Sequence, residues 1–504
     1  SSHHFSQAMQ NSVVCSIWKD SMEGDVISEL SDDILCYIVS FLTTREAAAT
    51  GCISRRWRHI WKKTPELELD AATFTGGTAA GAGVPSHRLR DFAGWVDGVL
   101  RSRGGARLES FRLKYPVGDE ESGGDVDRWV ERALAMNARK LEINLDGGAS
   151  DRPRRNSYVF PHSVLANSPT VSHLSLSSCS LHLPGDFPGW DRLKSLTVKR
   201  TSLSESDVGG ILSGCPSLEW LSIARCDCPP LLKLSGERCP RRLRHLNLYR
   251  CQSLQQIEIH GSVNLESFEF AGMELARVFV KNTGRLVRLR FGYVWEFLAG
   301  VTYALDGLAR DFPQLETLLL PVTVFEKEEI PKQIIRFTQL RRLVLSIVGA
   351  PPTSLLELTS AFLFACPLLH TLELHMPNSF SGGGAAEGEV SFEKYCRHGR
   401  LRKVGLYNFH GGRYEVEVGM YLLGAAAALQ SVWVVIGKSF DYRGDGEWCA
   451  VEQAGMEDRI QASQVRRLFG HAMDPSTALV VRDSSFPSPL KNDLTPKEKL
   501  TELN

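Results

Sequence analysis

Residues 218–226 read LEWLSIARC, residues 243–251 read LRHLNLYRC, and residues 171–179 read VSHLSLSSC. All three follow the pattern L-x-x-L-x-L with other apolar residues allowed, and a cysteine stands three places after its end. Apolar residues two apart predict a short β-strand with one buried side. A pattern that returns this often predicts stacked units, each giving one strand to a parallel sheet. Further copies begin at Leu193, Leu315, Leu340, Leu369, Leu401 and Leu429, and weaker ones at Leu108 and Ala138.

The pattern resembles the leucine-rich repeat, whose strands form a parallel sheet on the concave side of a curved solenoid. The resemblance implies an α/β fold. In one region the central apolar residues Leu246, Ile257, Phe268, Val278 and Leu289 stand only 10 or 11 residues apart. A coil of about 20–29 residues does not close over that spacing. We therefore predict Leu246, Phe268 and Leu289 in the concave sheet, Ile257 and Val278 on strands of the opposite wall, and all five buried.

Apolar stretches between the strands predict helices on the back of the coils. They are SDVGGILSG at 206–214, LLELTSAFLFA at 355–365 and YEVEVGMYLLGAAAAL at 414–429. Cys179, Cys226 and Cys251 take the place where a buried side chain of this repeat serves the turn backbone. The repeat explains these cysteines better than a zinc site does, because no C-x-x-C pair has metal spacing.

The front of the chain, residues 25–70, is apolar yet too short to hide that surface by itself. Apolar residues recur at helical spacing over residues 30–42, where Ser31 is a suitable N-cap. Two further short helices are predicted, one from about Arg45 and one in SRRWRHIWKK at 54–63. The surplus apolar surface docks either on the repeats or on another protein, and the periodicity alone leaves both open.

This front segment resembles an F-box, in the form common before plant leucine-rich repeats. ELSDDIL at 29–35 matches the family's opening, except that Ser31 stands where proline is usual, and SRRWR at 54–58 matches in full. The resemblance implies docking to a Skp-type adaptor and, through it, to a cullin and a ring-finger protein. The adaptor-binding residues that it implies are Leu30, Ser31, Ile34, Leu35, Ile38, Val39, Leu42 and Trp57.

Near the far end, CPLLHTLELHM and the following LRKVGLYNF are similar to the plant FBD region. The predicted organisation is a disordered extension (1–24), an F-box (25–70), a linker (71–104), the repeat solenoid (105–365), FBD-like terminal repeats (366–440), and a C-terminal cap with a disordered tail (441–504). Gly-rich, Ser-rich or acidic stretches at 73–87, 116–127 and 378–390 are predicted to be mobile loops.

Charge and motif content limit the function classes. Lys and Arg total 58, and Asp and Glu total 58, so a zero net charge argues against general affinity for nucleic acid or membrane. No apolar run reaches the length of a membrane span and no secretory signal is evident, so we expect reduced cysteines in the nucleus or cytoplasm. The sequence holds no phosphate loop, H-E-x-x-H or G-x-S-x-G motif, and we predict neither a cofactor nor catalysis.

These observations favour a substrate-recognition subunit of an SCF-type (Skp-cullin-F-box) ubiquitin ligase. The F-box would hold the adaptor and the repeats a protein substrate, so that ubiquitin transfer becomes effectively intramolecular. The alternative is a repeat scaffold that binds a partner without ubiquitin transfer.

Side chains that alternate with the buried strand residues face the predicted groove. Arg288 and Arg290 leave the same face of one strand, and Arg342 and Lys403 take the equivalent place two and four strands later. We hypothesise that an acidic segment of a protein substrate binds there, while a small molecule or inositol phosphate in the groove stays open. The substrate-groove candidates are Trp220, His245, Tyr249, Arg288, Arg290, Arg342, Lys403 and Tyr407.

Overall fold

A computed structural model describes residues 27, 30–75, 85–116, 121–146, 158–166, 168, 170–184, 187–235, 239–261, 264–272, 277–291, 305, 307–323, 334–348, 354–376, 397–437, 439–442, 448–451 and 460–482. The chain divides into two compact units. Unit 1 is Ser1–Leu218 with Arg225–Asp227, and unit 2 is Glu219–Ala224 with Cys228–Asn504. Each unit is an α/β stack of coils built around parallel strands, which confirms the predicted fold class.

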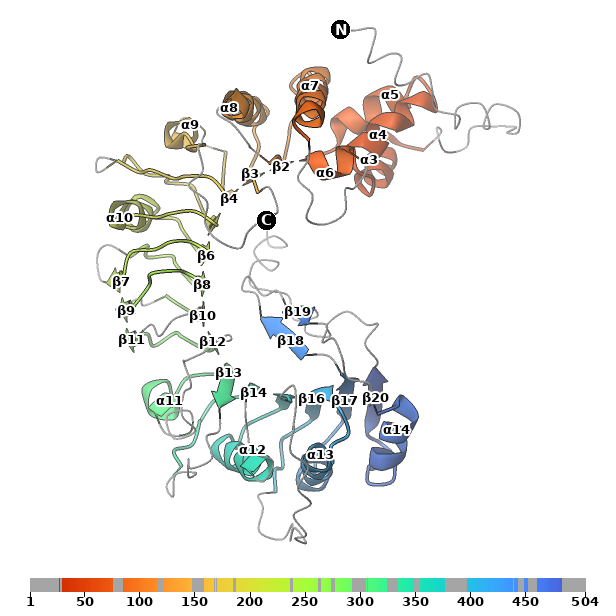
Figure 1. Cartoon of the computed structure of the whole chain (residues 1–504), viewed down its shortest axis with the longest axis vertical. Coiled ribbons are helices and arrows are strands. Elements are labelled where there is room, and N and C mark those ends of the chain that lie inside the picture. Colours follow the sequence, from red (N-terminus) through yellow and green to blue (C-terminus); the bar gives the residue numbers. More distant parts are fainter. Residues whose placement is uncertain are drawn as a thin grey trace. The chain divides into compact units, whose positions relative to one another are not determined.

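Unit 1 begins with short helices and continues into a parallel sheet. The front helices are α3 (Asp32–Ser40), α4 (Thr44–Ala49) and α5 (Trp57–Ile60). The sheet has the order β1 (Glu66–Asp70), β2 (Ser110–Lys114), β3 (Lys140–Asn144), β4 (His173–Ser177) and β5 (Ser195–Lys199). The helices between and after these strands are α6 (Ala71–Phe74), α7 (Ser86–Ser102), α8 (Glu121–Ala135), α9 (His162–Ala166) and α10 (Glu205–Gly214). Helices α7, α8 and α9 cover the same side of the sheet (Figure 1).

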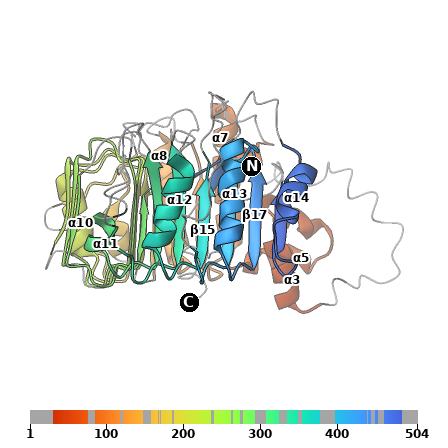
Figure 2. The same cartoon turned by 90° about the horizontal axis from the view of Figure 1, so that it is seen from below.

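Unit 2 continues the same plan with more strands. Its long sheet has the order β6 (Trp220–Ala224), β8 (His245–Tyr249), β10 (Ser267–Ala271), β12 (Arg288–Phe291), β13 (Thr317–Thr323), β14 (Arg342–Val348), β15 (Thr371–His375), β16 (Lys403–Phe409), β17 (Ser431–Ile436) and β20 (Ala478–Arg482). Its helices are α11 (Leu308–Asp311), α12 (Ser354–Ala365), α13 (Arg413–Ala425) and α14 (Ala462–Gly470). Helices α12, α13 and α14 line the same side of the sheet, with β15 visible between α12 and α13 and β17 between α13 and α14 (Figure 2). The three helices predicted from apolar stretches are thus α10, α12 and α13.

A second, smaller sheet forms the back of unit 2 where the spacing is short. It has the order β11 (Arg277–Lys281), β9 (Gln256–His260) and β7 (Leu231–Ser235). Phe268 pairs with Leu246 on one side and Leu289 on the other, while Val278 pairs with Ile257 in the back sheet. The predicted two-sided arrangement is confirmed. Only the burial of Val278 was wrong: it is half-buried, whereas Leu232 on β7, the other edge strand of this sheet, is buried.

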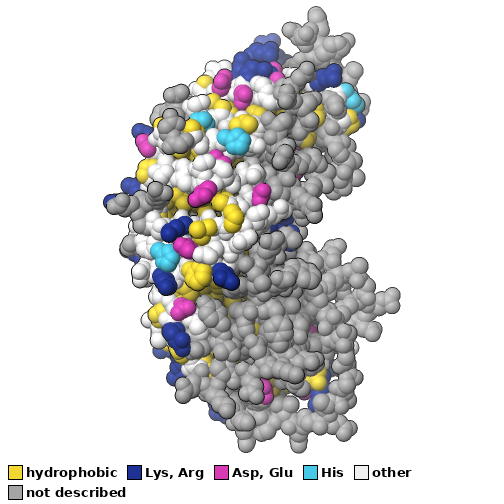
Figure 3. All heavy atoms as spheres, turned by 60° about the vertical axis from the view of Figure 1, so that its left-hand side comes forward, with side chains coloured by type: hydrophobic (Ala, Val, Ile, Leu, Met, Phe, Trp, Pro, Cys, Tyr) yellow, Lys and Arg dark blue, Asp and Glu magenta, His cyan; other side chains and the backbone are white. Residues whose placement is uncertain are grey.

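The outer face of this back sheet mixes apolar and charged side chains. Leu231 is 44% exposed and Phe279 is 42% exposed. Lys233 lies 3.6 Å from Glu258 on the neighbouring strand. Figure 3, which brings this side forward, shows hydrophobic, basic, acidic and histidine side chains interspersed. Such mixed surfaces are ordinary for soluble proteins.

The repeat cysteines are buried as predicted, but their thiols bind the carbonyls of strand residues and not of the turns. All three are buried, and the Cys226 thiol donates to the carbonyl of Val198 at 3.4 Å, as the Cys251 thiol does to Ile223 at 3.3 Å. The thiol of Cys179 donates to Ser177 at 3.4 Å. All three acceptor carbonyls belong to strand residues, and those of Val198 and Ile223 lie on the strand of the preceding coil, so these two thiols link consecutive coils.

The predicted boundaries need several corrections. The supposed linker at 71–104 contains α6 and α7, and Phe92 and Val96 of α7 are fully buried. The loop predicted at 116–127 is partly the start of α8, and the cap at 441–504 contains a further helix and strand, α14 and β20. The predicted loop at 378–390, the extension at 1–24 and the tail beyond 482 lie outside the described residues.

Candidate functional site

The front helices are fixed by caps and by one carboxylate. The side chain of Ser31 accepts a hydrogen bond from the backbone of Ile34 at 3.4 Å, which confirms it as the N-cap of α3. Asp32 in the first turn binds Arg56 at 2.6 Å and Lys63 at 2.7 Å, which ties α3 to the third helical segment. Hydrogen bonds from Lys63 and then Arg56 lower the pKa of Asp32. Ser31 and Arg56 of the recognised motifs therefore support the fold of the front segment.

The apolar residues of the front segment divide into a core and a surface. Leu35, Val39 and Trp57 are at most 3% exposed and form the core of the front helices, so they leave no surface for direct contact in this structure, and their assignment to adaptor binding stays a prediction. Leu30 is half-buried and Ser31 is exposed. The core also takes Ala47, Ile60 and Trp61.

One side of α3 and its C-terminal end leave large apolar side chains in solvent. Tyr37 is 66% exposed and Phe41 is 71% exposed, and their rings pack edge to face at 4.9 Å. Ile34, Ile38 and Leu42 are between 38% and 47% exposed, and their predicted role in adaptor binding stays a prediction. Sequence reasoning missed Tyr37 and Phe41, although both stand at helical spacing with Ile34 and Ile38. We call these five residues the front apolar face: Ile34, Tyr37, Ile38, Phe41 and Leu42.

The front helices are anchored to the first coils within unit 1. The Thr44 hydroxyl donates to the backbone carbonyl of Glu68 at 2.6 Å, which joins α4 to β1. At the end of α7, the buried guanidinium of Arg103 donates to the carbonyls of Thr64 at 2.5 Å and Trp61 at 3.3 Å. Burial lowers the pKa of Arg103 to about 10, so it remains charged at neutral pH.

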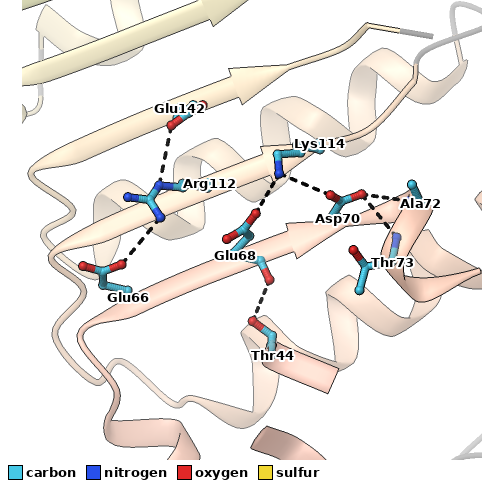
Figure 4. Close-up of polar contacts among 9 residues, drawn as sticks. All are labelled: Thr44, Glu66, Glu68, Asp70, Ala72, Thr73, Arg112, Lys114 and Glu142. Atoms are coloured by element: carbon cyan, nitrogen blue, oxygen red, sulfur yellow. Dashed lines mark hydrogen bonds and ion pairs between the residues drawn. The ribbon is translucent and has the colours of Figure 1, made fainter. Parts of the chain in front are cut away.

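A network of charged side chains crosses the open face of β1, β2 and β3 (Figure 4). Lys114 binds Glu68 at 2.8 Å and Asp70 at 3.3 Å, and Arg112 lies between Glu66 at 3.6 Å and Glu142 at 3.5 Å. Exposed pairs of this kind contribute little individually. Beside them lies a cavity of about 230 Å³, whose lining includes Leu42, Thr44, Trp61, Glu68, Phe74 and Arg112.

On the open face of the unit 2 sheet, the predicted register of the basic candidates is confirmed. Arg288 is aligned with Thr317, Thr317 with Arg342, Arg342 with Thr371, and Thr371 with Lys403. The arginines therefore stand in one row across alternate strands.

Their charges, however, are matched inside the chain. Arg288 lies 3.4 Å from Glu266 and Arg290 lies 3.0 Å from Glu269. The charges of these two arginines therefore have partners inside the chain, and the hypothesis that they bind an acidic segment of a substrate stays a prediction.

The same holds further along the sheet. Arg342 lies 2.7 Å from Glu373, which is 4% exposed. Lys403 differs, because it is exposed and lies 5.8 Å from the ring centre of Trp433.

The aromatic candidates are buried and do not form an open groove. Trp220, Tyr249 and Tyr407 are at most 3% exposed, and His245 is 7% exposed. The rings of Trp220 and His245 lie 5.3 Å apart. Burial, with Arg288, Arg244 and Arg290 nearby, lowers the pKa of His245 to about 3, so it is neutral at physiological pH. These candidates pack on the sheet face and give it rigidity.

A metal ion needs several ligands close together, and a membrane span needs a long apolar helix. In those ranges, no three His, Cys, Asp or Glu side chains gather closely enough to hold a metal ion. Of the helices that the structure describes, none combines the length and apolar composition that crossing a membrane requires.

The comparisons with known proteins match both parts of the chain. The family model "At1g61320/AtMIF1, LRR domain" matches residues 99–457, and the F-box domain model matches residues 27–68. The first of these assigns residues 366–440 to the leucine-rich-repeat domain, so their FBD-like resemblance is not confirmed.

Curated relatives come from Arabidopsis thaliana. F-box/LRR-repeat protein At3g03360 is 30% identical over 234 residues, which is 45% of this chain and 44% of that one. F-box/LRR-repeat protein At5g02910 is 32% identical over 226 residues, 44% of each chain. F-box/LRR-repeat protein At3g58900 is 27% identical over 304 residues, 58% of this chain and 76% of that one. The chain thus spans less than half of the first two relatives. An internalin structure from Listeria monocytogenes superposes with a TM-score of 0.27 and 12% identity over 60% of this chain and 94% of that one, too low to carry an argument.

Proposed function

Because this chain belongs to the At1g61320/AtMIF1 leucine-rich-repeat domain family and carries an F-box in front of it, we propose that it is the substrate-recognition subunit of an SCF-type ubiquitin ligase. In this proposal the F-box docks a Skp-type adaptor, which brings a cullin and a ring-finger protein. The repeats bind a protein substrate. Residence in the nucleus or cytoplasm remains part of the proposal.

The front apolar face is the observation that carries the adaptor role. Phe41 and Tyr37 are each about two-thirds exposed or more, beside three exposed aliphatic side chains. Burying apolar surface is favourable by about 25 cal/mol per Å², and a contiguous apolar patch is typical of a protein interface. Aromatic anchors at the centre of such a patch are the usual hot spots of binding.

The proposed role needs no catalytic group in this chain. Two binding sites on one molecule raise the effective concentration of the substrate beside the transferring enzyme. The alternative, a repeat scaffold without ubiquitin transfer, predicts that no Skp-type adaptor binds. Adaptor binding therefore separates the two functions.

The test compares surface and core substitutions in α3. Phe41→Asp and Ile38→Asp place a charge in the front apolar face, so we expect loss of co-purification with a Skp-type adaptor and an unchanged melting temperature. Leu35→Asp places a charge in the core and should instead unfold the front helices. Arg466→Glu, on the exposed side of α14, is the control that keeps adaptor binding. Adaptor capture at the native level by both surface variants would remove this role from the front apolar face.

A further inference from the structure

The N-terminal edge of strands β14, β15 and β16 carries a second set of basic residues, two of which stand one position before the predicted Arg342 and Lys403. The backbone N–H of His370 donates to the carbonyl of Arg341 at 2.8 Å, and that of Arg402 donates to His370 at 2.9 Å. Arg341, His370 and Arg402 are therefore direct neighbours on adjacent strands. We call these three residues the basic row.

A fixed turn places a further arginine beside the basic row. The Nδ1 atom of the buried His398 accepts hydrogen bonds from the backbone N–H groups of Arg400 at 3.2 Å and Leu401 at 2.9 Å. Because Nδ1 accepts, the proton is on Nε2, which donates to the carbonyl of Cys366 at 2.9 Å. This arrangement holds Arg400 just before β16, and Lys403 follows Arg402 directly.

Unlike the arginines of the sheet face, the two arginines of the basic row and Arg400 have no ion-pair partner among the described residues. Arg341, Arg400 and Arg402 are exposed, and within the part of the chain that the structure describes no carboxylate lies within ion-pair distance of them. Partial burial lowers the pKa of His370, and the positive charges of Arg402, Arg341 and Arg400 lower it further. The described charged groups that act on this half-buried histidine are all basic.

The neighbours on either side limit the row. Glu316 precedes β13 on one side and Gln430 precedes β17 on the other, each joined to the row through backbone hydrogen bonds of 2.8 Å. Adjacent strands lie about 4.8 Å apart, so the three positions span about 10 Å. An extended peptide covers that distance in about three residues.

We propose that the basic row, with Arg400 and Lys403, binds a short acidic segment of the protein substrate, extended across strands β14 to β16, with carboxylates two or three residues apart. This inference rests on the proposed function, because it names the substrate class that the repeats take. A protein ligand is favoured over nucleic acid because the row is narrow and the chain as a whole carries a formal net charge of zero.

The test measures direct binding of labelled peptides to the full chain. The probe is a heptapeptide that alternates glutamate with alanine, and matched peptides replace glutamate with glutamine or lysine. We expect the native chain to bind the glutamate peptide at least tenfold more tightly than the other two, and more weakly as salt rises. The double variant Arg341→Glu/Arg402→Glu should lose at least tenfold in affinity for the glutamate peptide and gain affinity for the lysine peptide. Both side chains are exposed, so the fold should persist, which circular dichroism checks.

The control variant Arg466→Glu/Arg467→Glu removes the same charge from the exposed side of α14 and should change the affinity less than twofold. An equal loss in that control, or no preference of the native chain for the glutamate peptide, overturns the proposal. The proposal is also overturned if a single-stranded oligonucleotide binds through the same arginines more tightly than the glutamate peptide does, because the ligand would then be nucleic acid. Adaptor co-purification, which the double variant should retain, is measured in parallel, so a failure of the ligase role is seen separately.

Discussion

Ser178, Arg200, Arg225 and Arg250 each take a left-handed backbone conformation directly after a strand, with φ of 57°, 53°, 55° and 47°. The coils turn away from the sheet at these places. This conformation costs a residue with a Cβ atom about 1–2 kcal/mol, whereas glycine adopts it without that cost. The repeat therefore keeps the turn although none of the four is glycine.

Ser178→Gly should consequently raise the free energy of unfolding by about 0.5–1 kcal/mol, because relief of the left-handed conformation exceeds the added chain entropy. Ser175→Gly, on the extended strand β4, is the matched control and should lower it by about 0.5–1 kcal/mol. Urea denaturation of both variants measures the difference. Equal destabilisation by the two substitutions would contradict the assigned turn.

Buried histidines make unit 2 sensitive to acid. Burial lowers the pKa of His245 and that of His375 to about 3, against about 6.5 in an unfolded chain. As the pH falls below 6.5, the unfolded chain takes up protons that the folded chain does not, so the free energy of unfolding decreases. The slope is about 1.4 kcal/mol per pH unit for each histidine down to pH 3, and above pH 6.5 the contribution vanishes.

His245→Gln should therefore reduce the slope of the free energy of unfolding against pH, between pH 6 and pH 4, by about 1.4 kcal/mol per pH unit, the contribution of one proton. Denaturant titrations at a series of pH values measure this slope. His87→Gln, at an exposed position, is the control. An unchanged slope in the His245 variant would show that this imidazole is protonated in the folded chain.

Among the elements, the two opposed walls of unit 2 are the part of the fold that the spacing alone predicted. Phe268 on β10 and Ile257 on β9 are fully buried, and Phe279 on β11 is 42% exposed. Phe268→Ala should lower the free energy of unfolding by about 3–5 kcal/mol, and Ile257→Ala by about 2–5 kcal/mol. Phe279→Ala should change it by less than about 1 kcal/mol. Chemical denaturation tests this ranking, and a Phe279 effect as large as that of Ile257 would refute it.

Sequence periodicity predicted these elements because a buried strand face repeats every second residue. It missed β1, whose ELELD sequence follows the front helices so closely that it was included with them, and β7, which lacks the full pattern. It also gave the face of each side chain without showing what packs against it. The pairing of Arg342 with Glu373 depends on the register of two strands 31 residues apart, which no local pattern contains.

On the scale of the whole molecule, the front helices and the first coils form part of the same compact unit. Arg103 joins them, because its guanidinium donates hydrogen bonds to the carbonyl of Trp61 and to the carbonyl and hydroxyl of Thr64. Arg103→Met removes these hydrogen bonds and should loosen the front helices from α7. We expect faster proteolysis after residues 62 and 63, and faster hydrogen exchange in α5, while exchange in β14 to β16 stays the same. Slow, native-like proteolysis of the variant would show that Arg103 is dispensable for the junction.

This junction has a consequence for how a ligase subunit would choose its target lysine. Thr44 is hydrogen-bonded to β1, and Arg103 is hydrogen-bonded to Thr64 at the end of the front helices. We therefore expect the F-box to keep a fixed orientation relative to the first repeats. An adaptor bound to the front apolar face would therefore also have a fixed orientation relative to β1–β5. A bound substrate would have to bring its acceptor lysine to the transfer site by its own motion, because the F-box would not move relative to the first repeats. Inserting a flexible Gly-Ser segment after Thr64 should then broaden the set of lysines that receive ubiquitin without altering substrate affinity, which mass spectrometry of the modified substrate would reveal.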